Sequence, residues 1–428
     1  MAKSTIYVGL EIGTSKICVV VGEVRVDGAI KILGVGQAPS RGVRKGEIVD
    51  FENAQACLHD ALVRAEDRSD VMINNVFLAI TGAHIKSFNN RGTIRIPEEQ
   101  NEITNEDLEE VKEIARDVDI PQEDVFLHSI IRDYYVDGQE KVQQPAGMFG
   151  KILEADYHII HSIKTRVQNT IRCVREIPLD VEDVVFSPVA SAQVVLTQEH
   201  KDRGALLLDI GGGTTDYVMY SGGSISRSGS IGVGGDHITN DISVVMKIPL
   251  TKAERLKVKY GSAIVPDIPD TEPIVIDDDP QLAGREIDST LLSEIINARM
   301  TETLERLRDQ LSQDGELAAL GAGVFLTGGC SKLDGLDKLT EQIFNLPVSR
   351  GNIGSMSGAS AAFENPQYST PMGLIRYAQI LDANRPRLSP IQRIGKKLGG
   401  ILSGSKLLIW CGVLLAGFLL VGSLLGTF

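Results

Sequence analysis

Cysteine and aromatic residues are scarce in this sequence, and several common functional signatures are missing from it. The five cysteines are scattered, with no C-x-x-C pair, and only Cys57 has a histidine, His59, close by. A disulfide framework and a zinc site are therefore both unsupported, and a reducing cytosol fits the composition. The sequence has no G-x-x-x-x-G-K-[ST] P-loop, no clean G-x-G-x-x-G fingerprint, and no Ser-His-Asp or G-x-S-x-G signal.

Positive charge is also in short supply. The 43 lysines and arginines are outnumbered by 57 acidic residues, which gives a formal net charge of −14. A nucleic-acid backbone would be repelled by such a surface, so no nucleic-acid partner is expected. No signal peptide precedes the first apolar segment, and we expect the body of the protein to stay inside the cell.

Two glycine-rich segments are the most informative features that the sequence does contain. They are Tyr7–Lys16 (YVGLEIGTSK) and Leu206–Asp216 (LLLDIGGGTTD), and each predicts a strand, a tight turn and a second strand. Glu11 and Asp209 stand one residue before the turn, where a carboxylate can hold a hydrated cation. Backbone N–H groups of a glycine-rich turn bind oxyanions, and neighbouring hydroxyl groups add donors. Two such turns facing each other would clamp a polyphosphate.

Two further segments complete the pattern. Gly323–Ser331 (GVFLTGGCS) predicts a strand, a glycine turn and then a helix, which would present free N–H donors to a ligand. Phe186–Val195 predicts a helix of small residues with Pro188 near its start. Small residues let two backbones approach closely, as a hinge between two lobes requires.

The order of these elements resembles the superfamily of actin, sugar kinases and DnaK-type chaperones. Within it, several segments closely resemble the FtsA family of bacterial cell-division proteins: Gly9–Ile17, Gly42–Val49, Ser187–Ala192, Asp209–Tyr217 and Ile231–Ile242. The resemblance covers about residues 5–382. It implies an α/β, actin-like two-lobed fold of duplicated ribonuclease-H-like mixed sheets with helices on both faces, and a small inserted α+β subdomain.

The expected domain boundaries follow from the resemblance and from the pattern of elements. The segments are a first lobe core (1–83 and 164–196), an inserted subdomain (84–163), a second lobe core (197–247 and 320–382), its smaller subdomain (248–319), a basic linker with an amphipathic segment (383–406) and a transmembrane anchor (407–428). Short strands are expected in the insertion, around a helix at Thr104–Val118 that opens with a capping box.

Helical spacing predicts further elements in the second lobe. A long helix is expected over Ile287–Leu311, with one buried face formed by Ile287, Leu291, Ile295, Leu304, Leu307 and Leu311. The acidic run Asp277–Asp279 is interpreted as a solvated loop rather than a calcium site, because the glycine and glutamate of an EF-hand loop are missing.

The C-terminal tail predicts a second function. Residues 407–428 carry no charge and would span roughly 33 Å as a helix at about 1.5 Å per residue, enough to cross a bilayer core of about 30 Å. Lysines and arginines with no acidic residue among them precede this segment. Such cationic flanks favour the cytoplasmic side of a membrane, so the body of the protein is expected to lie in the cytoplasm. Residues 394–402 also resemble the amphipathic membrane-targeting helix of FtsA proteins. The sequence favours a transmembrane anchor over a surface-lying helix, and either over a helix buried in the body.

The resemblance implies that the cofactors are ATP and Mg²⁺. The residues that would hold the nucleotide are Gly13, Thr14, Ser15 and Lys16 from the first lobe, Gly211, Gly212, Gly213, Thr214 and Thr215 from the second, and Gly234, Gly235, Asp236, Glu254, Lys257, Gly328, Gly329 and Ser331 around the ribose and base. Glu11 and Asp209 would orient waters on Mg²⁺, which prefers few protein ligands. No catalytic residue is assigned.

Simpler interpretations exist for several of these residues. Lys16 could be a solvated strand end, Glu254 and Lys257 an ordinary surface ion pair, and Asp216 a cap of its own turn rather than part of the site. His158 and His161 fall on opposite faces of an extended segment, so two packed or solvated histidines are expected rather than metal ligands.

The leading hypothesis is an FtsA-like tether on the cytoplasmic side of the cell membrane, at the division site. ATP binding would favour head-to-tail self-assembly, with weak ATPase activity at most. The resemblance implies downstream division proteins as partners, and FtsZ, whose acidic C-terminal peptide would dock on the smaller subdomain near Arg299 and Arg306. The sequence offers no base or hydroxyl-binding cleft for a kinase, and no chaperone β domain after the linker. The alternative is an actin-like ATP-binding scaffold of another membrane machine, such as pilus assembly.

Overall fold

The computed structural model describes residues 4–266, 274–276, 284–312, 315–353, 356–358 and 365–384. Residues 1–379 form one compact unit. The acidic run Asp277–Asp279, residues 385–406 of the expected linker and the expected transmembrane segment 407–428 lie outside the described residues. Within the described ranges, no helix combines the length and the apolar character needed to cross a membrane.

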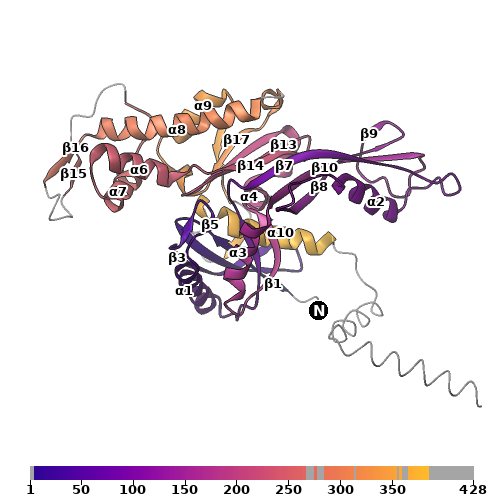
Figure 1. The fold of residues 1–428 in the computed structure, drawn as a ribbon, viewed down its shortest axis with the longest axis horizontal. Helices are drawn as coiled ribbons and strands as arrows, with labels where there is room; N and C mark the ends of the chain where they lie inside the picture. Colours follow the sequence, from indigo (N-terminus) through magenta and orange to yellow (C-terminus); the bar gives the residue numbers. More distant parts are fainter. Residues whose placement is uncertain are drawn as a thin grey trace, which may run out of the picture. The chain divides into compact units, whose positions relative to one another are not determined.

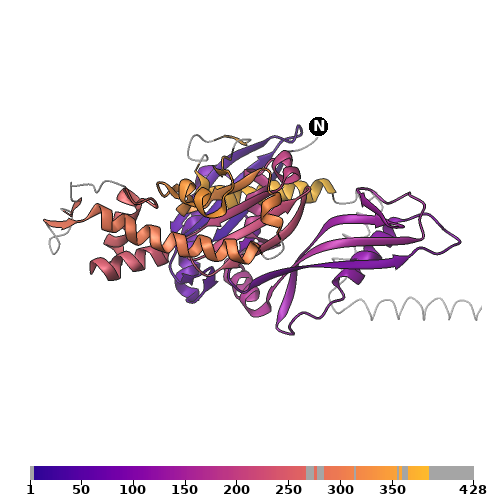
Figure 2. The same ribbon diagram turned by 90° about the horizontal axis from the view of Figure 1, so that it is seen from above.

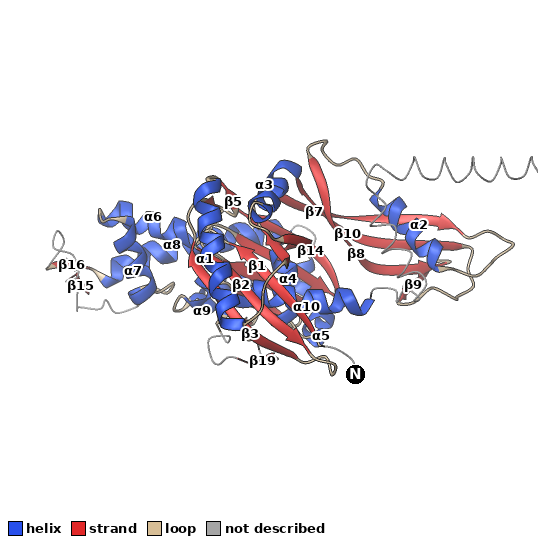
Figure 3. Ribbon diagram, turned by 90° about the horizontal axis from the view of Figure 1, so that it is seen from below, coloured by secondary structure: helices blue, strands red, loops and turns tan. Residues whose placement is uncertain are grey.

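The first lobe is built on a six-stranded mixed sheet with the order β11-β6-β1-β2-β3-β19. β1 pairs with β2 in antiparallel register and with β6 in parallel register. The helix α1 (Phe51–Ser69) begins at Asp50, whose side chain accepts from the N–H of Asn53, and it lies across β2 and β3 (Figure 3). The strands are β1 (Thr5–Ile12), β2 (Lys16–Val24), β3 (Ile30–Pro39), β6 (Asn75–Ile80), β11 (Asp180–Phe186) and β19 (Met356–Gly358), with a separate small pair β4 (Val43–Arg44) and β5 (Glu47–Ile48).

The second lobe repeats this arrangement in a five-stranded sheet, β14-β13-β12-β17-β18. β12 is antiparallel to β13 and parallel to β17, as β1 is to β2 and β6. The repeated pairing confirms the duplicated lobes that the two hairpins predict. The elements are β12 (Ala205–Ile210), β13 (Thr215–Ser221), β14 (Ser224–Ile231), β17 (Gly323–Thr327) and β18 (Val348–Arg350), with α5 (Gln198–Arg203), α9 (Leu336–Phe344) and a short 3₁₀ turn η2 (Glu316–Ala319).

The smaller subdomain of the second lobe is mostly helical. Its elements are α6 (Gly235–Met246), α7 (Leu250–Tyr260), α8 (Ser289–Leu311) and the hairpin β15 (Ile274–Ile276) and β16 (Arg285–Ile287). The predicted face of α8 is correct in its C-terminal half and at Ile287, which precedes the helix, but wrong in its N-terminal half. Leu292, Ile296 and Met300 are buried there, whereas Leu291 is 36% exposed and Ile295 is partly buried. These buried residues lie on the same helix face as Leu304, Leu307 and Leu311. Leu291 and Ile295 each precede a buried residue by one position, which turns them about 100° away from that face.

The inserted subdomain is a four-stranded sheet with the order β7-β10-β8-β9. Its strands are β7 (Ile85–Arg95), β8 (Asp124–Val136), β9 (Gln139–Val142) and β10 (Ile152–Ile163). Three of them are long, and Figure 2 shows them side by side in purple, so the prediction of short strands is wrong. Register shifts between β8 and β10 interrupt the alternation of apolar and polar residues that would have indicated longer strands. The helix α2 (Asn105–Arg116) packs on β7 and β10, and the predicted capping box at Thr104 is present.

A partly buried polar seam joins the inserted subdomain to β14, the edge strand of the second lobe. Ser87 donates its hydroxyl proton to the Ser228 carbonyl at 2.7 Å, and the Asn89 amide donates to the Ser226 carbonyl at 3.0 Å. The two ring nitrogens of His158 lie 2.7 Å from Asn89 Oδ1 and 2.8 Å from the Ser228 hydroxyl. Loss of hydration lowers the pKa of His158 to about 3, so the ring is neutral. The subdomain is therefore inserted into the sequence of the first lobe, but its side chains also bond to the second lobe.

Two helices cross at close range between the sheets. They are α4 (Ser187–Val195) and α10 (Ser369–Asn384), which Figure 1 shows side by side; α3 (Lys164–Arg175) packs on β11. A Cβ atom on Gly373 of α10 would lie 2.0 Å from the carbonyl oxygen of Ala190 in α4. This contact confirms that the small residues of α4 serve a close backbone approach.

Candidate functional site

Both hairpins and the third glycine turn line one cavity of about 530 Å³. The predicted residues on its wall are Glu11, Gly13, Thr14, Ser15, Lys16, Asp209, Gly211, Gly212, Gly213, Thr214, Asp236, Glu254, Lys257, Gly328 and Gly329. The four other residues predicted to hold the nucleotide, Thr215, Gly234, Gly235 and Ser331, lie behind this wall. Thr215 donates to the Val233 carbonyl, and Ser331 donates to the Gly328 carbonyl.

The two turns have the same geometry and face each other. The N–H of Gly13 donates to the Lys16 carbonyl at 3.0 Å, and the N–H of Gly211 donates to the Thr214 carbonyl at 2.9 Å. A Cβ atom on Gly213 would lie 2.4 Å from the Thr14 hydroxyl oxygen of the opposite turn. Only glycine permits this approach, so the gap between the turns is set by the absence of a side chain.

Two acidic side chains stand at the strand ends beside the turns. Among the described residues, Glu11 Oε2 is one of the few buried polar atoms without a hydrogen-bond partner. Loss of hydration raises the pKa of Glu11 to about 7, against the opposing effect of Lys16. Asp209 Oδ2 accepts from the hydroxyls of Ser191 at 2.8 Å and Thr370 at 3.1 Å, and burial raises the pKa of this carboxyl as well.

This pair fits a hydrated divalent cation. A cation with its waters would give Glu11 Oε2 the partner that it lacks, and it would neutralise two carboxylates that burial disfavours. Mg²⁺ keeps several waters and needs only one or two carboxylates beside a substrate phosphate. The described residues contain no group of three or more His, Cys, Asp or Glu side chains that could hold a metal directly.

Asp216 lies at the same cavity and contacts the other lobe. Its two carboxylate oxygens are each 2.6 Å from the hydroxyl of Thr81, which follows β6. Burial raises the pKa of Asp216 to about 7. Asp216 is thus part of the cavity, and its carboxyl contacts a residue beyond its own turn. Thr81 was not predicted; the available signal was its place at the carboxyl end of a strand parallel to β1.

Lys16 is held at the cavity by a segment that the sequence did not indicate. Its ammonium group donates to the carbonyl oxygen of Gln367 and lies 5.0 Å from the centre of the Tyr368 ring. Gln367 belongs to the 3₁₀ turn η5 (Pro366–Tyr368), and Pro366, Gln367 and Thr370 all line the cavity. Lys16 is therefore not a solvated strand end.

The side of the cavity away from the hairpins is formed by α6 and α7. Lys257 is buried, and its ammonium group contacts the Gly235 carbonyl at 3.0 Å, the Thr239 hydroxyl at 2.9 Å and the Glu254 carboxylate at 2.6 Å. An ordinary surface pair would not bury its lysine, so Glu254 and Lys257 are not an ordinary surface ion pair. Apolar residues that were not predicted complete this wall and suit the faces of a planar ring: Ile238, Val258 and Leu333.

The third glycine turn differs from its predicted form. Gly328 has φ +86°, and the residues after it form a single 3₁₀ turn, η3 (Gly329–Lys332), instead of an α-helix. The α-helix α9 begins only at Leu336, after a second left-handed glycine at Gly335. The predicted dipole of a full helix is therefore absent at this turn, and the N–H of Gly328 donates to the Pro366 carbonyl at 3.3 Å.

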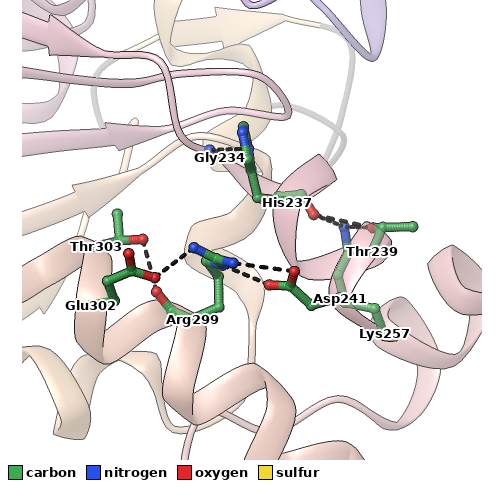
Figure 4. A network of polar contacts seen from close by, with 9 residues as sticks. Gly234, His237, Thr239, Asp241, Lys257, Arg299, Glu302 and Thr303 are labelled. Carbon is green, nitrogen blue, oxygen red and sulfur yellow. Dashed lines mark hydrogen bonds and ion pairs between the residues drawn. The ribbon is translucent and has the colours of Figure 1, made fainter. Parts of the chain in front are cut away.

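A second hollow, of about 480 Å³, lies between α6 and α8. It contains Val244, Leu291 and Ile295 from these two helices, and Val244 is 66% exposed. Arg299, a predicted partner-binding residue, stands at its edge and pairs with both carboxylate oxygens of Asp241, at 2.6 and 3.2 Å, and with Glu302 (Figure 4). Arg306, the other predicted partner-binding residue, lies farther along α8 and is exposed.

Comparisons with known proteins agree with the resemblance. A family model described as "Cell division protein FtsA" matches residues 206–373, and one described as "SHS2 domain inserted in FTSA" matches residues 82–161. The chain is 37% identical over 370 residues to Cell division protein FtsA of Pseudomonas aeruginosa, covering 86% of this chain and 88% of that protein. It is 35% identical over 392 residues to the Escherichia coli K12 protein of the same name, covering 89% and 92%.

Solved structures with a similar fold are more distant in sequence. A PilM–PilN type IV pilus biogenesis complex matches with a TM-score of 0.60 and 17% identity, covering 87% of this chain and 98% of that one. MreB5 of Spiroplasma citri, solved with ADP, matches with a TM-score of 0.54 and 16% identity, covering 89% and 98%. These likenesses establish the actin-like fold.

Proposed function

The chain belongs to the FtsA family of actin-like cell-division proteins, and on that premise we propose that it binds ATP with Mg²⁺ between its lobes and tethers FtsZ filaments to the cytoplasmic membrane. The observation that carries the nucleotide site is the pair of facing glycine turns, each with a buried carboxyl at its strand end. Such a pair binds a polyphosphate from two sides.

Each part of the cavity has a role in this proposal. Backbone N–H groups of the two turns, with the hydroxyls of Thr14 and Thr214, bind the β- and γ-phosphates, and Lys16 adds a positive charge. Glu11 and Asp209 hold the waters of Mg²⁺, which neutralises phosphate charge when bound. The base lies against the apolar wall beside α7.

The working event is binding rather than turnover. Residues from both lobes hold one ligand, so the nucleotide favours the closed arrangement of the lobes and, with it, head-to-tail self-assembly. We assign no general base and expect weak ATPase activity at most.

The hollow between α6 and α8 supports the proposed FtsZ contact. The resemblance implies an acidic C-terminal peptide of FtsZ, and this hollow offers apolar side chains beside Arg299. Asp241 and Glu302 already neutralise Arg299, so its main task is to fix the helices, whereas the exposed Arg306 is available to an acidic peptide. The apolar lining would then supply most of the affinity.

Membrane attachment is assigned to the C-terminal residues on sequence grounds. The cationic linker and the apolar segment 407–428 would anchor the protein to the inner leaflet, either across the bilayer or along its surface. At the division site the tether would also recruit downstream division proteins.

Reconstitution tests the whole proposal. The full chain is mixed with anionic lipid vesicles and FtsZ, and co-sedimentation is measured with and without ATP and Mg²⁺. We expect FtsZ to sediment with the vesicles only when this protein is present, and more strongly with nucleotide. FtsZ that stays in the supernatant under all conditions would contradict the tether.

The alternative, a scaffold of pilus assembly, is separated from the tether by depletion in the cell. Loss of a division tether gives long undivided cells, whereas loss of a pilus scaffold gives cells that divide normally but lose motility or secretion. The fold likeness to the PilM–PilN complex, at 17% identity, does not favour the alternative.

A further inference from the structure

The segment Pro366–Thr370 contacts three of the residues assigned to the nucleotide and its cation, and we propose that it is an internal competitor that nucleotide binding displaces. This inference rests on the proposed nucleotide site. If the segment is such a competitor, the residues that bind the nucleotide hold the start of α10 when no ligand is bound. They release it when a ligand binds. The segment would thus report the state of the cavity to α10.

The first contact engages the phosphate-binding lysine. The Lys16 ammonium group donates to the neutral Gln367 carbonyl and lies over the Tyr368 ring, which is itself fixed by a 2.7 Å hydrogen bond from its hydroxyl to Gln37 Oε1. Hydrogen bonds between two charged groups are stronger than bonds from a charged donor to a neutral carbonyl. A phosphate in the cavity would therefore draw Lys16 away from Gln367 and Tyr368.

The second contact engages the cation-binding carboxylate. Thr370, in the first turn of α10, donates to Asp209 Oδ2, the same oxygen that Ser191 contacts. Ser191 also lies 2.9 Å from the Thr370 hydroxyl, so the three groups form a closed triangle. A water on Mg²⁺ that donates to this same oxygen must compete with the two hydroxyls for its lone pairs.

The third contact uses a donor of the glycine turn after β17. The N–H of Gly328 donates to the Pro366 carbonyl at 3.3 Å, and Thr327 donates its hydroxyl proton to the same oxygen at 3.2 Å. The Gly328 N–H becomes available to a ligand only when Pro366 moves. All three contacts therefore oppose nucleotide binding, although each one stabilises the ligand-free chain.

The place of the segment explains why its displacement matters. It leads without interruption into α10, which meets α4 at Gly373 and Ala190. Loss of the bonds at Thr370 loosens the first turn of α10, while the contacts farther along the helix remain. One of these is the 2.9 Å bond from Gln379 to the Gly28 carbonyl.

The sign of a mutational effect distinguishes a competitor from a structural support. We measure Mg²⁺–ATP binding to the full chain by calorimetry, for wild type, Thr370→Val and Tyr368→Leu. A competitor predicts that each substitution raises the affinity about two- to tenfold, the range expected for the loss of one hydrogen bond or one cation–π contact. Gln379→Ala, which also removes a bond of α10 but far from the cavity, should leave the affinity unchanged.

Hydrogen exchange supplies a second readout. Backbone amides of residues 366–373 should exchange faster in the wild-type protein when nucleotide is added, and those around Gln379 should not change. Affinities that fall or stay equal in both variants, or amides of 366–373 that become more protected with nucleotide, would overturn the competitor while the nucleotide site stands. Failure of the wild-type protein to bind nucleotide would overturn the proposed function and this inference together.

Discussion

The hydroxyl oxygen of Thr81 in the first lobe lies 2.6 Å from both carboxylate oxygens of Asp216 in the second lobe. The Thr81 hydroxyl oxygen is also 3.1 Å from the Thr214 hydroxyl oxygen. Thr81, which directly follows β6, therefore contacts two residues of the glycine hairpin in the second lobe. This contact joins the lobes beside the cavity. Because the Asp216 carboxyl is buried, its protonation state is coupled to stability.

Asp216 predicts a pH dependence for the nucleotide-free protein. Burial raises its pKa from 3.8 to about 7 in the folded state, so the folded protein holds a proton that the unfolded chain releases. The stability linked to this proton is fully present below about pH 4 and is lost as the pH rises to about 7, by roughly 4 kcal/mol for this shift. Asp216→Asn, which mimics the protonated form, should remove this part of the slope.

Urea unfolding at several pH values measures the effect. The difference in unfolding free energy between Asp216→Asn and wild type should grow in favour of the variant between about pH 4 and about pH 7. Asp67→Asn, on the exposed face of α1, is the matched control and should follow the wild-type curve. Parallel curves for Asp216→Asn and wild type would show that the carboxyl is ionised in the fold.

The seam at His158 predicts a large loss of stability on substitution. His158→Phe keeps a buried ring but leaves the buried Ser228 hydroxyl without its partner, which should cost about 1–3 kcal/mol. The pKa of His158 is lowered to about 3, so its contribution is present above about pH 6.5 and is lost as the pH falls below that value. The cost of the substitution should therefore shrink in acid.

Chemical unfolding of His158→Phe tests this prediction. His59→Phe, an exposed position on α1, serves as the control and should have a small effect. A cost under about 0.5 kcal/mol for His158→Phe would mean that the seam contributes little to folding.

The proposed FtsZ contact at the hollow between α6 and α8 predicts which substitutions weaken binding of the FtsZ peptide. Leu291→Glu places a charge among apolar side chains and should weaken binding of the FtsZ C-terminal peptide at least about tenfold. Charge reversal at both Arg299 and Arg306 should also weaken it, and Arg306→Glu alone is the cleaner variant because Arg299 holds Asp241. Fluorescence anisotropy with a labelled peptide measures each affinity.

The control for this series is Met72→Glu, at an apolar position that is 81% exposed and lies outside the hollow. It should bind the peptide like wild type. Unchanged affinity in Leu291→Glu and in both arginine variants would place the FtsZ contact elsewhere on the protein.

The parts of the fold that the sequence predicted correctly are determined by neighbouring residues. A glycine turn beside an acidic strand end, the capping box at Thr104 and the small residues of α4 each act within a few positions. The buried face of α8 was only half predicted, because Leu291 and Ile295 are apolar yet line a hollow. An apolar residue at a binding surface and one in the core look alike in a sequence.

The unpredicted parts of the site depend on contacts between distant positions. Thr81 meets Asp216 over 135 residues, and Lys16 meets Gln367 over 351 residues. Neither Thr81 nor Gln367 belongs to a motif with a chemical signature. The Gln367 contact uses a backbone carbonyl, which every residue type offers, so no side-chain pattern indicates it.

The central claim is that a nucleotide is held between the two glycine turns, and Mg²⁺–ATP binding to Asp209→Ala and Gly212→Val tests it most directly. Asp209→Ala removes a carboxylate of the proposed cation site. Gly212→Val places a branched side chain where even a Cβ atom would lie 3.3 Å from Ser15 Cβ. We predict that calorimetry shows binding by the wild-type chain and a loss of most of the affinity in each variant, with both still folded. Full affinity in both variants would contradict the assignment.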